Sequence, residues 1–365
     1  MGTTKKITAG AVAAALGAVT LTACGGEGGG SGEKPGGAGS KTVTLVSHDS
    51  FAASDAVLKE FTARTGYTVK VLKSGDAVEA VNKAVLTKGA PQGDVFFGVD
   101  NTTLSRALGN DVFEPYEAKG LDRVDPAVRL DGDGHRVTPV DYGDICVNYD
   151  KRYFADRKLA PPATFDDLAK PAYKDLLVVE NPERSTPGLG FLLGTAAAYG
   201  DTGWQDYWKK LKANGVKVVD SWEIAYNQEF SGSAGGRKAG ADRPLVVSYA
   251  SSPPVEVLYG DPKPAEAPTG VSTGTCFRQI EFAGLLKGAA NREGGKALID
   301  FMIGKTFQED VPLTMFVHPV AEDAALPELF TKHGVVIDKP LTLAPDKIAQ
   351  NRDPWVQAWS SLVLK

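Results

Sequence analysis

The chain has 365 residues, of which 42% are hydrophobic, 8% aromatic and 23% charged. This composition supports a large buried core, and it excludes a disordered chain, a small disulfide-knitted toxin and a polytopic membrane protein. The 40 Lys and Arg against 45 Asp and Glu give a formal net charge of −5, so no overall basic field indicates a nucleic acid partner. Three cysteines are too few for a disulfide framework or a four-thiolate zinc site, and the length favours two lobes.

Residues 1–23 are typical of a secretory signal. Two lysines precede an uncharged, largely apolar run over 11–21, which is too short to span a membrane. The signal ends in Leu-Thr-Ala-Cys, and two glycines follow Cys24. This ending resembles the lipobox of bacterial lipoproteins, which implies cleavage before Cys24 and a lipid attached to its sulfur. An ordinary signal with a chance cysteine is the alternative.

Residues 24–41 form a Gly-rich tether after the lipidated cysteine. Nine of the 41 glycines lie in this stretch, which has no large apolar side chain and therefore cannot bury a core. Cleavage removes two lysines, so the mature net charge is 38 − 45 = −7. We expect an extracytoplasmic protein, lipid-anchored to the bacterial cell membrane, whose functional body spans 42–365.

The body alternates β-rich runs with amphipathic stretches. Strands are expected at 43–46, 67–72, 95–99, 176–179, 216–219 and 244–249, and helices at 52–64, 76–87, 188–199, 202–212, 222–230, 293–303 and 344–362. The extended run 137–149 lies between two such groups and suits a crossing between lobes. The pattern predicts an α/β fold with parallel sheets and a cleft between lobes: 42–143, 144–272, and a return over 273–365 to the first lobe.

Polar side chains follow the first and third strands. Asp49 and Ser50 come before the first helix, and Asp100 directly follows the third strand. Each is also explained as a simple helix cap. Two acids at the carboxyl ends of neighbouring strands favour a shared site that faces a cation.

Hydroxyl groups and an aromatic ring mark the next candidates. Tyr142 lies in the crossover run, as a wall of the cleft or as an ordinary packed tyrosine. Ser185 and Thr186 precede Pro187 at a helix start, where free N–H groups suit a phosphate or another anion. A helix start without a ligand is the alternative.

Aromatic residues mark the later strands and helices. Trp222 and Tyr226 are four residues apart and share a helix face, and Tyr249 ends a strand shortly before Ser251. A core stripe is the usual meaning of this spacing. Aromatic faces beside carboxylates also suit a flat cation, through a cation–π attraction of ~0.5–2 kcal/mol each.

These segments together resemble a known family. The motifs are DSF at 49–51, GVDN at 98–101, DYG at 141–143, STPGLG at 185–190, WEIAY at 222–226 and SYASSP at 248–253. With the tail at 351–355 they resemble the thiamine-binding proteins of bacterial ABC importers. The resemblance implies a two-lobed type II periplasmic-binding-protein fold with a hinge of crossover strands. It also implies a monomer that binds thiamine or thiamine phosphate, docks on a membrane permease, and needs no metal, other cofactor or catalytic residue.

The resemblance also implies roles for individual residues. Trp222 and Tyr249 would hold the rings of the ligand beside Tyr226, while Ser185 and Thr186 would face its hydroxyethyl or phosphate end. The remaining expected site residues are Asp49, Ser50, Asp100, Tyr142, Ser251 and Phe316. Phe316 stands where the family has a tryptophan, so an indole N–H is missing. His318, nearby, is either a pH-sensitive contact or a structural residue.

Two cysteines remain after lipidation of Cys24. Cys146 lies in the outgoing crossover and Cys276 in the expected return strand, so we predict a disulfide that ties the two crossings at the hinge. A free Cys146 thiolate with Glu223 as its base would instead indicate a thiamine-degrading enzyme. A binding protein for ferric ion or a polyamine is a further alternative, although the adjacent tyrosine pair expected for iron is absent.

Glycines punctuate several of the motifs. Gly98, Gly143, Gly188 and Gly190 stand in the segments expected to form the cleft. Because glycine has no Cβ, we expect the backbone at these positions to approach the ligand.

Overall fold

The computed structural model describes residues 40–365. The expected signal over 1–23, Cys24 and nearly all of the tether over 24–41 lie outside the described residues. The expected lobe boundaries within 42–365 stay a prediction.

The described strands form one sheet, in the order β2-β1-β3-β9-β5-β8-β6-β7, with β4 paired to β9 and β10 paired to β5. The strands are β1 (Thr42–Ser47), β2 (Thr68–Lys73), β3 (Val95–Asp100), β4 (Phe113–Glu114), β5 (Thr138–Asp150), β6 (Leu177–Glu180), β7 (Lys217–Val219), β8 (Leu245–Tyr249), β9 (Thr269–Leu286) and β10 (His318–Pro319).

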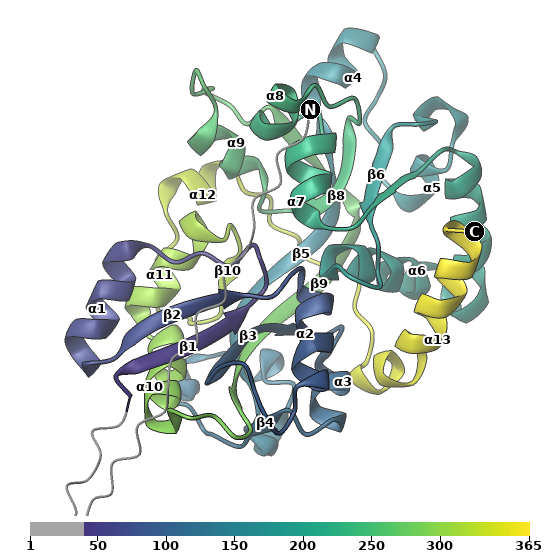
Figure 1. The fold of residues 1–365 in the computed structure, drawn as a ribbon. Coiled ribbons are helices and arrows are strands. Elements are labelled where there is room, and N and C mark those ends of the chain that lie inside the picture. The colour runs from purple at the N-terminus through teal and green to yellow at the C-terminus, as the bar shows by residue number, and fades with distance from the viewer. Residues whose placement is uncertain (1–39) are drawn as a thin grey trace, which may run out of the picture. The chain divides into compact units, whose positions relative to one another are not determined.

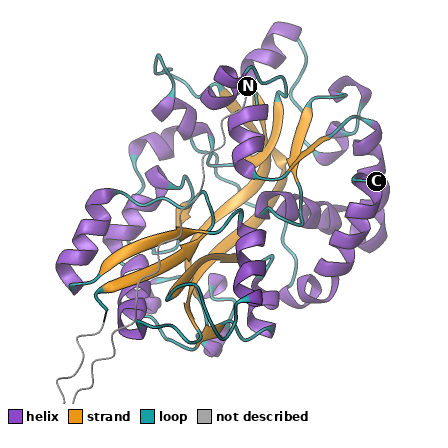
Figure 2. Ribbon diagram, in the orientation of Figure 1, coloured by secondary structure: helices purple, strands orange, loops and turns teal. Residues whose placement is uncertain are grey.

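Two parallel groups lie at the two ends of this sheet. β1 is parallel to β2 and β3, and β6 is parallel to β7 and β8, as the alternation of strands and helices predicts. The long strands β5 and β9 are antiparallel to each other and join the two groups through the centre (Figure 2). The crossover expected over 137–149 is thus confirmed as β5. We call β1–β3 with their helices the β1 side, and β6–β8 with their helices the β8 side.

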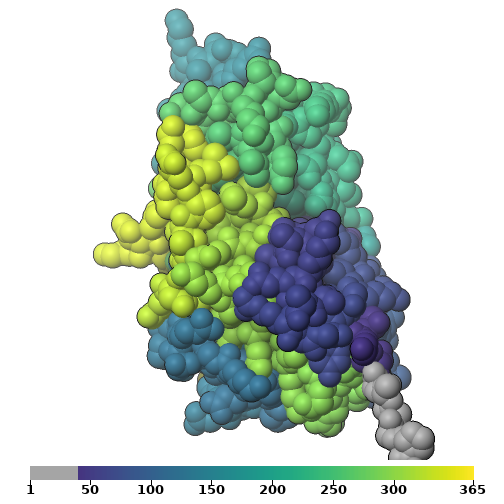
Figure 3. All heavy atoms as spheres, turned by 90° about the vertical axis from the view of Figure 1, so that its left-hand side faces the viewer, coloured from purple at the N-terminus to yellow at the C-terminus, as the bar shows by residue number. Residues whose placement is uncertain are grey.

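Helices cover the sheet on both of these sides (Figure 1). They are α1 (Asp55–Thr65), α2 (Ala77–Leu86), α3 (Leu104–Gly109), α4 (Lys151–Arg157), α5 (Phe165–Leu168), α6 (Thr186–Ala213), α7 (Trp222–Ile224), α8 (Ala234–Ala239), α9 (Pro253–Tyr259), α10 (Arg292–Met302), α11 (Lys305–Thr314), α12 (Glu328–His333) and α13 (Pro345–Val363). Figure 3 looks onto α1, in purple-blue, beside the yellow-green C-terminal segments and below the green segments near residue 250.

Several helix ends follow from local chemistry. The Ser54 hydroxyl accepts the Val57 N–H at the start of α1, and Gly66 with φ 74° ends that helix, as expected. Gly200, with φ 75°, breaks α6 between the two helices expected over 188–199 and 202–212. The helix expected over 222–230 is only one turn of α-helix, which continues as the π-helical turn Ala225–Glu229.

The strands bury apolar side chains on both faces. Val95 and Phe97 of β3 pack in one cluster with residues of α1 and α10, whereas Phe96 and Val99 pack in another with residues of α2 and α3. On the β8 side, α6 and α13 bury tryptophans against each other, including an edge-on pair with ring centroids 5.3 Å apart. The tail motif at 351–355 therefore belongs to α13, and its Trp355 is buried in this core.

Candidate ligand-binding site

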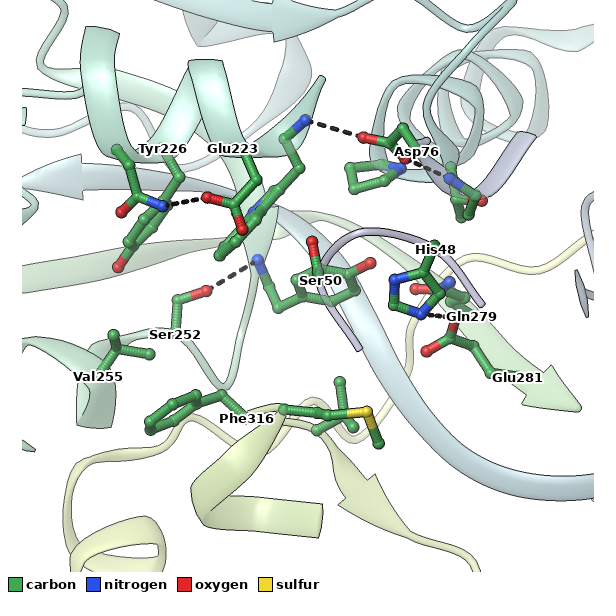
Figure 4. A pocket seen from close by; sticks show the side chains of 18 of the residues that line it. His48, Ser50, Asp76, Glu223, Tyr226, Ser252, Val255, Gln279, Glu281 and Phe316 are labelled. Atoms are coloured by element: carbon green, nitrogen blue, oxygen red, sulfur yellow. Dashed lines mark hydrogen bonds and ion pairs between the residues drawn. The ribbon is translucent and has the colours of Figure 1, made fainter. Parts of the chain in front are cut away.

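A cavity of about 280 Å3 opens between the β1 side and the β8 side (Figure 4). Its lining comes from both sides and from the central strand β9. The lining residues are His48, Ser50, Asp76, Ala77, Thr186, Pro187, Trp222, Glu223, Tyr226, Asn227, Tyr249, Ser252, Val255, Tyr259, Gln279, Glu281, Thr314, Met315, Phe316 and Val317. Residues more than 200 positions apart in the sequence thus meet at one concave site, which is typical of a ligand pocket.

An aromatic wall covers the β8 side of the cavity. The rings of Trp222 and Tyr226 are stacked with centroids 5.0 Å apart and an interplanar angle of 16°. Tyr226 is only 1% exposed, so it backs the half-buried Trp222. The Trp222 indole N–H donates to the Ser248 hydroxyl at 2.9 Å, which fixes the ring plane. The wall offers a flat, pre-oriented surface to a ring or a cation.

Tyr249 continues this wall at the end of β8. Its backbone N–H donates to the Ser252 hydroxyl at 3.2 Å, and that hydroxyl also lies 2.9 Å from the Ser248 hydroxyl. Burial, followed by the charges of nearby acids of which Glu281 is the largest, raises the pKa of Tyr249 well above its ordinary value. Tyr249 is therefore a neutral phenol that can donate a hydrogen bond.

Titratable groups form the β1 side of the cavity. The His48 Nε2 lies 3.4 Å from the Glu281 Oε1, and both side chains are at most 12% exposed. Burial alone lowers the pKa of His48, but the hydrogen bond and charge of Glu281, with smaller contributions from Asp76 and Asp49, raise it overall. Glu281 therefore favours protonation of His48, and the two side chains face each other in the cavity lining (Figure 4).

Asp76 links the two sides. One carboxylate oxygen caps α2 by accepting the Ala77 backbone N–H at 2.6 Å. The other oxygen accepts the Trp222 backbone N–H at 3.0 Å. Burial raises the pKa of Asp76, against the two backbone hydrogen bonds, which lower it. The carboxylate therefore lies beside the aromatic wall although it belongs to the opposite side.

A second link closes the lower edge of the cavity. The Ser251 hydroxyl donates to the Phe316 carbonyl at 2.6 Å, and the Phe316 ring meets the Tyr259 ring edge-on at 6.0 Å. Phe316 has a φ of 56°, a left-handed conformation that is costly for a non-glycine residue. The hydrogen bond from Ser251 thus helps to hold Phe316 at the cavity.

Six of the expected site residues come together in the cavity lining. They are Ser50, Thr186, Trp222, Tyr226, Tyr249 and Phe316. Ser251 is adjacent to this set, but it holds Phe316 in place and does not line the cavity. Ser185 occupies the N-cap position of α6 without a side-chain capping hydrogen bond; it is fully buried and also outside the lining.

The expectation that Asp49 and Asp100 form one cation-facing site is wrong in its geometry. Asp49 is exposed, and its carboxylate accepts the Gly75 N–H at 3.1 Å. Asp100 is fully buried, and its carboxylate accepts hydrogen bonds from Thr102, Thr103 and Gln279. Neither carboxylate lines the cavity, and Asp100 instead holds the turn between β3 and α3, whose N-cap is Thr103.

Tyr142 lies at a different hollow. Tyr142 is on β5. Its ring stacks on the His318 ring with centroids 5.0 Å apart, and the Arg278 guanidinium lies 4.8 Å from the Tyr142 ring centroid. These three residues line a separate surface hollow of about 330 Å3. The expectation that Tyr142 is a wall of the ligand cavity is therefore corrected, because its ring contacts Arg278 of β9 and His318 of β10.

The glycines expected to approach the ligand make room for protein side chains instead. A Cβ at Gly98 would lie 2.4 Å from the His48 ring, and one at Gly143 would lie 2.9 Å from the Tyr249 ring. These glycines allow two cavity residues to take their positions.

The sequence did not indicate four of the polar lining residues: His48, Asp76, Gln279 and Glu281. Asp76 follows β2 and caps α2, so the same pattern that marked Asp49 and Asp100 was present. Gln279 and Glu281 are two apart on β9 and therefore point to one face of the strand. Their spacing shows that they share a face, but not that this face lines the cavity.

Cys146 and Cys276 are joined by a disulfide, with their Cα atoms 4.3 Å apart. The bond connects β5 to β9 in a small buried cluster with Ala250 and Ile337. Neither cysteine lines the cavity. Cys146 therefore has no thiol to act as the nucleophile of the enzyme alternative, whereas Glu223 does line the cavity.

Residues 40–365 lack two further features. No helix in this part is long and apolar enough to cross a membrane. No group of three or more His, Cys, Asp or Glu side chains there is placed to hold a metal ion.

A cavity between two α/β groups that are joined by crossing strands defines a solute-binding protein of the two-lobed periplasmic type. A family model described as bacterial extracellular solute-binding protein matches residues 56–336. The chain belongs to this family, and its α/β fold and extracytoplasmic setting follow from that membership.

Individual relatives narrow the comparison. A thiamine-binding periplasmic protein of Salmonella typhimurium (strain LT2) is 30% identical over 330 residues, which cover 88% of this chain and 93% of that protein. A solved periplasmic thiamin binding protein has a TM-score of 0.74 at 26% identity and covers 88% of this chain and 96% of its own. A ferric binding protein from Campylobacter jejuni has a TM-score of 0.69 at 17% identity, covers 88% and 99%, and shares the fold.

Proposed function

We propose that the chain captures thiamine, or a thiamine phosphate, outside the cytoplasm and delivers it to the permease of an ABC importer. The observation that carries this proposal is the stacked Trp222 and Tyr226 wall beside the carboxylates of Asp76 and Glu223. Thiamine combines two flat rings with a fixed positive charge on the thiazolium. A flat aromatic surface next to carboxylates matches both properties.

The relatives support the same ligand. The protein from Salmonella typhimurium and the solved homologue at 26% identity are both described as thiamine-binding, and each aligns with most of this chain. In this proposal Trp222 and Tyr249 contact the rings, and Phe316 covers the open edge. Thr186 faces the hydroxyethyl end, supported from behind by Ser185.

Membrane attachment and transport complete the proposal. Lipidation at Cys24 and the Gly-rich tether would keep a monomer at the outer face of the cell membrane, within reach of the permease. Ligand contacts on both sides of the cavity favour the closed arrangement, because a ligand shifts a conformational equilibrium by its differential affinity for the two states. The closed form is the one that docks on the permease.

Isothermal titration calorimetry of the purified full-length chain tests the ligand assignment. Thiamine, spermidine and ferric citrate are titrated separately under the same conditions. We expect a submicromolar dissociation constant for thiamine, and recovery of the vitamin intact after long incubation. Submicromolar binding of iron or spermidine without binding of thiamine would overturn the assignment. Degradation of the bound vitamin would restore the enzyme alternative.

A further inference from the structure

The side chains that line the cavity carry more negative than positive charge. Asp76, Glu223 and Glu281 contribute three carboxylates, whereas the lining identified within residues 40–365 contains no lysine or arginine. Asp76 belongs to α2, Glu223 to α7 and Glu281 to β9, so the carboxylates approach from three different elements. All three therefore line one cavity of about 280 Å3.

The basic groups nearest to the cavity are already paired. His48 faces Glu281 at 3.4 Å. Arg184, two residues before Thr186, pairs with Asp220 at 2.7 Å and with Glu79 at 3.6 Å, and its side chain is 44% exposed. A phosphate in the cavity would therefore find none of the free guanidinium or ammonium groups that proteins use to bind it.

The N-terminus of α6 is the one feature of the lining that suits an anion. Thr186 and Pro187 reach the cavity, and the hydroxyls of Ser185 and Thr186 are buried without a hydrogen-bond partner among the described residues. A helix N-terminus carries only about half a positive charge. It can bind the neutral hydroxyl of an alcohol, but half a charge does not balance a dianion that faces carboxylates.

Two other buried acids do not change this balance. Glu180 and Asp141 are fully buried, and their carboxyl oxygens have no hydrogen-bond partner in the described part of the chain. Burial raises the pKa of each well above its ordinary value. These shifts disfavour the charged form of both groups, and neither residue lines the cavity.

We infer that the cavity selects unphosphorylated thiamine and discriminates against thiamine monophosphate and diphosphate. This inference rests on the proposed thiamine function and makes it more specific. Selection acts by repulsion: His48 partly offsets the charge of Glu281, but Asp76 and Glu223 disfavour a phosphate in the cavity, while they favour the thiazolium charge.

Calorimetric titration of the full-length chain with the three forms of the vitamin tests this selectivity. We expect each phosphate to bind at least about tenfold more weakly than thiamine, a difference that widens at low salt because screening falls. E223Q should reduce the ratio of the monophosphate to the thiamine dissociation constant by several-fold. The substitution removes a charge but keeps a side-chain oxygen that can accept the hydrogen bond from Asn227. E293Q removes an exposed charge on α10, outside the cavity, and should leave the ratio unchanged.

The outcomes separate the two proposals. Equal or tighter binding of the monophosphate overturns the selectivity and leaves the thiamine function intact. No binding of any of the three forms overturns both. A wild-type preference for thiamine that E223Q and E281Q both leave unaltered would show that lining charge is not its cause, and would also overturn the inference.

Discussion

The two sides of the cavity recognise different properties of a ligand. The β8 side offers Trp222 backed by Tyr226, a rigid flat surface that selects for a ring. The β1 side offers the His48–Glu281 pair and Asp76, which select for charge. The β8 side adds one carboxylate of its own, Glu223 on α7, but only a flat cation that touches both sides gains the full interaction. This division couples recognition to closure of the cavity.

The sides are nevertheless joined at several points. The Asp76 carboxylate accepts the Trp222 N–H, the Ser251 hydroxyl donates to the Phe316 carbonyl, and the Glu79 N–H donates to the Arg184 carbonyl at 3.1 Å. The strands β5 and β9 add a covalent link through their disulfide. Changes to the disulfide should affect stability, whereas changes to the cavity lining, which includes Asp76, should affect affinity.

The largest effect is expected from removal of the disulfide, which belongs to neither surface. The bond closes a loop of 130 residues, and loss of such a loop costs about 2–5 kcal/mol of unfolding free energy. C146A/C276A should therefore lower the urea midpoint strongly, while its affinity for thiamine changes little at a temperature where it stays folded. An unchanged midpoint would show that the bond does not constrain the unfolded chain.

The aromatic side should dominate affinity. W222A removes the stacking surface and should weaken thiamine binding about tenfold, equivalent to ~1.4 kcal/mol. W222F keeps a ring against Tyr226 and loses only the hydrogen bond to Ser248, so its dissociation constant should lie between those of the wild type and W222A. Calorimetry measures all three, and circular dichroism checks the fold. Full affinity in W222A would mean that the tryptophan only packs against Tyr226.

The charged side should contribute less. D76N removes a negative charge beside Trp222 and should weaken thiamine binding about fivefold, or ~1 kcal/mol. The effect should shrink at high salt, since screening acts on the charge. D122N, at an exposed aspartate outside the cavity, is the matched control. If both variants bind alike, the β1 side does not select by charge.

The sequence predicted the architecture better than the acidic half of the site. Alternating strands and helices determine parallel pairing locally, and an aromatic at a helix start was a sound guide to the wall. Asp49, Asp76 and Asp100 all follow strands, but only Asp76 lines the cavity. Which of three equivalent acids turns inward depends on neighbours distant in sequence, such as Trp222, and local patterns do not contain that information.

Strand β9 shows the same limit. It is buried on both faces, so its residues do not alternate between apolar and polar in a way that marks the cavity face. Gln279 and Glu281 could be placed on one face by their spacing, but not on the face towards His48. Glycine was misleading for a related reason, because Gly98 accommodates the ring of a residue 50 positions earlier.

The smallest expected effect is at His318, which lies outside the ligand cavity and affects the pH dependence of folding stability. The ring stacks on Tyr142 and meets Phe330 edge-on at 4.9 Å. Burial, and then the Arg278 charge, lower the pKa of His318 to about 4. The unfolded chain takes up this proton near pH 6.5 but the folded chain only near 4. The folded state therefore loses stability as the pH falls through this window.

H318F keeps the stacked ring and removes the proton. Its unfolding free energy should fall less steeply between pH 6.5 and 4 than that of the wild type, by about 1 kcal/mol or less because the ring is only half-buried. Urea titrations at the two ends of this window measure the difference, with H135N as a control outside the stack. If the unfolding free energies of the wild type and H318F change equally with pH, the stack with Tyr142 does not exclude the proton. His318 then contributes no pH dependence to stability.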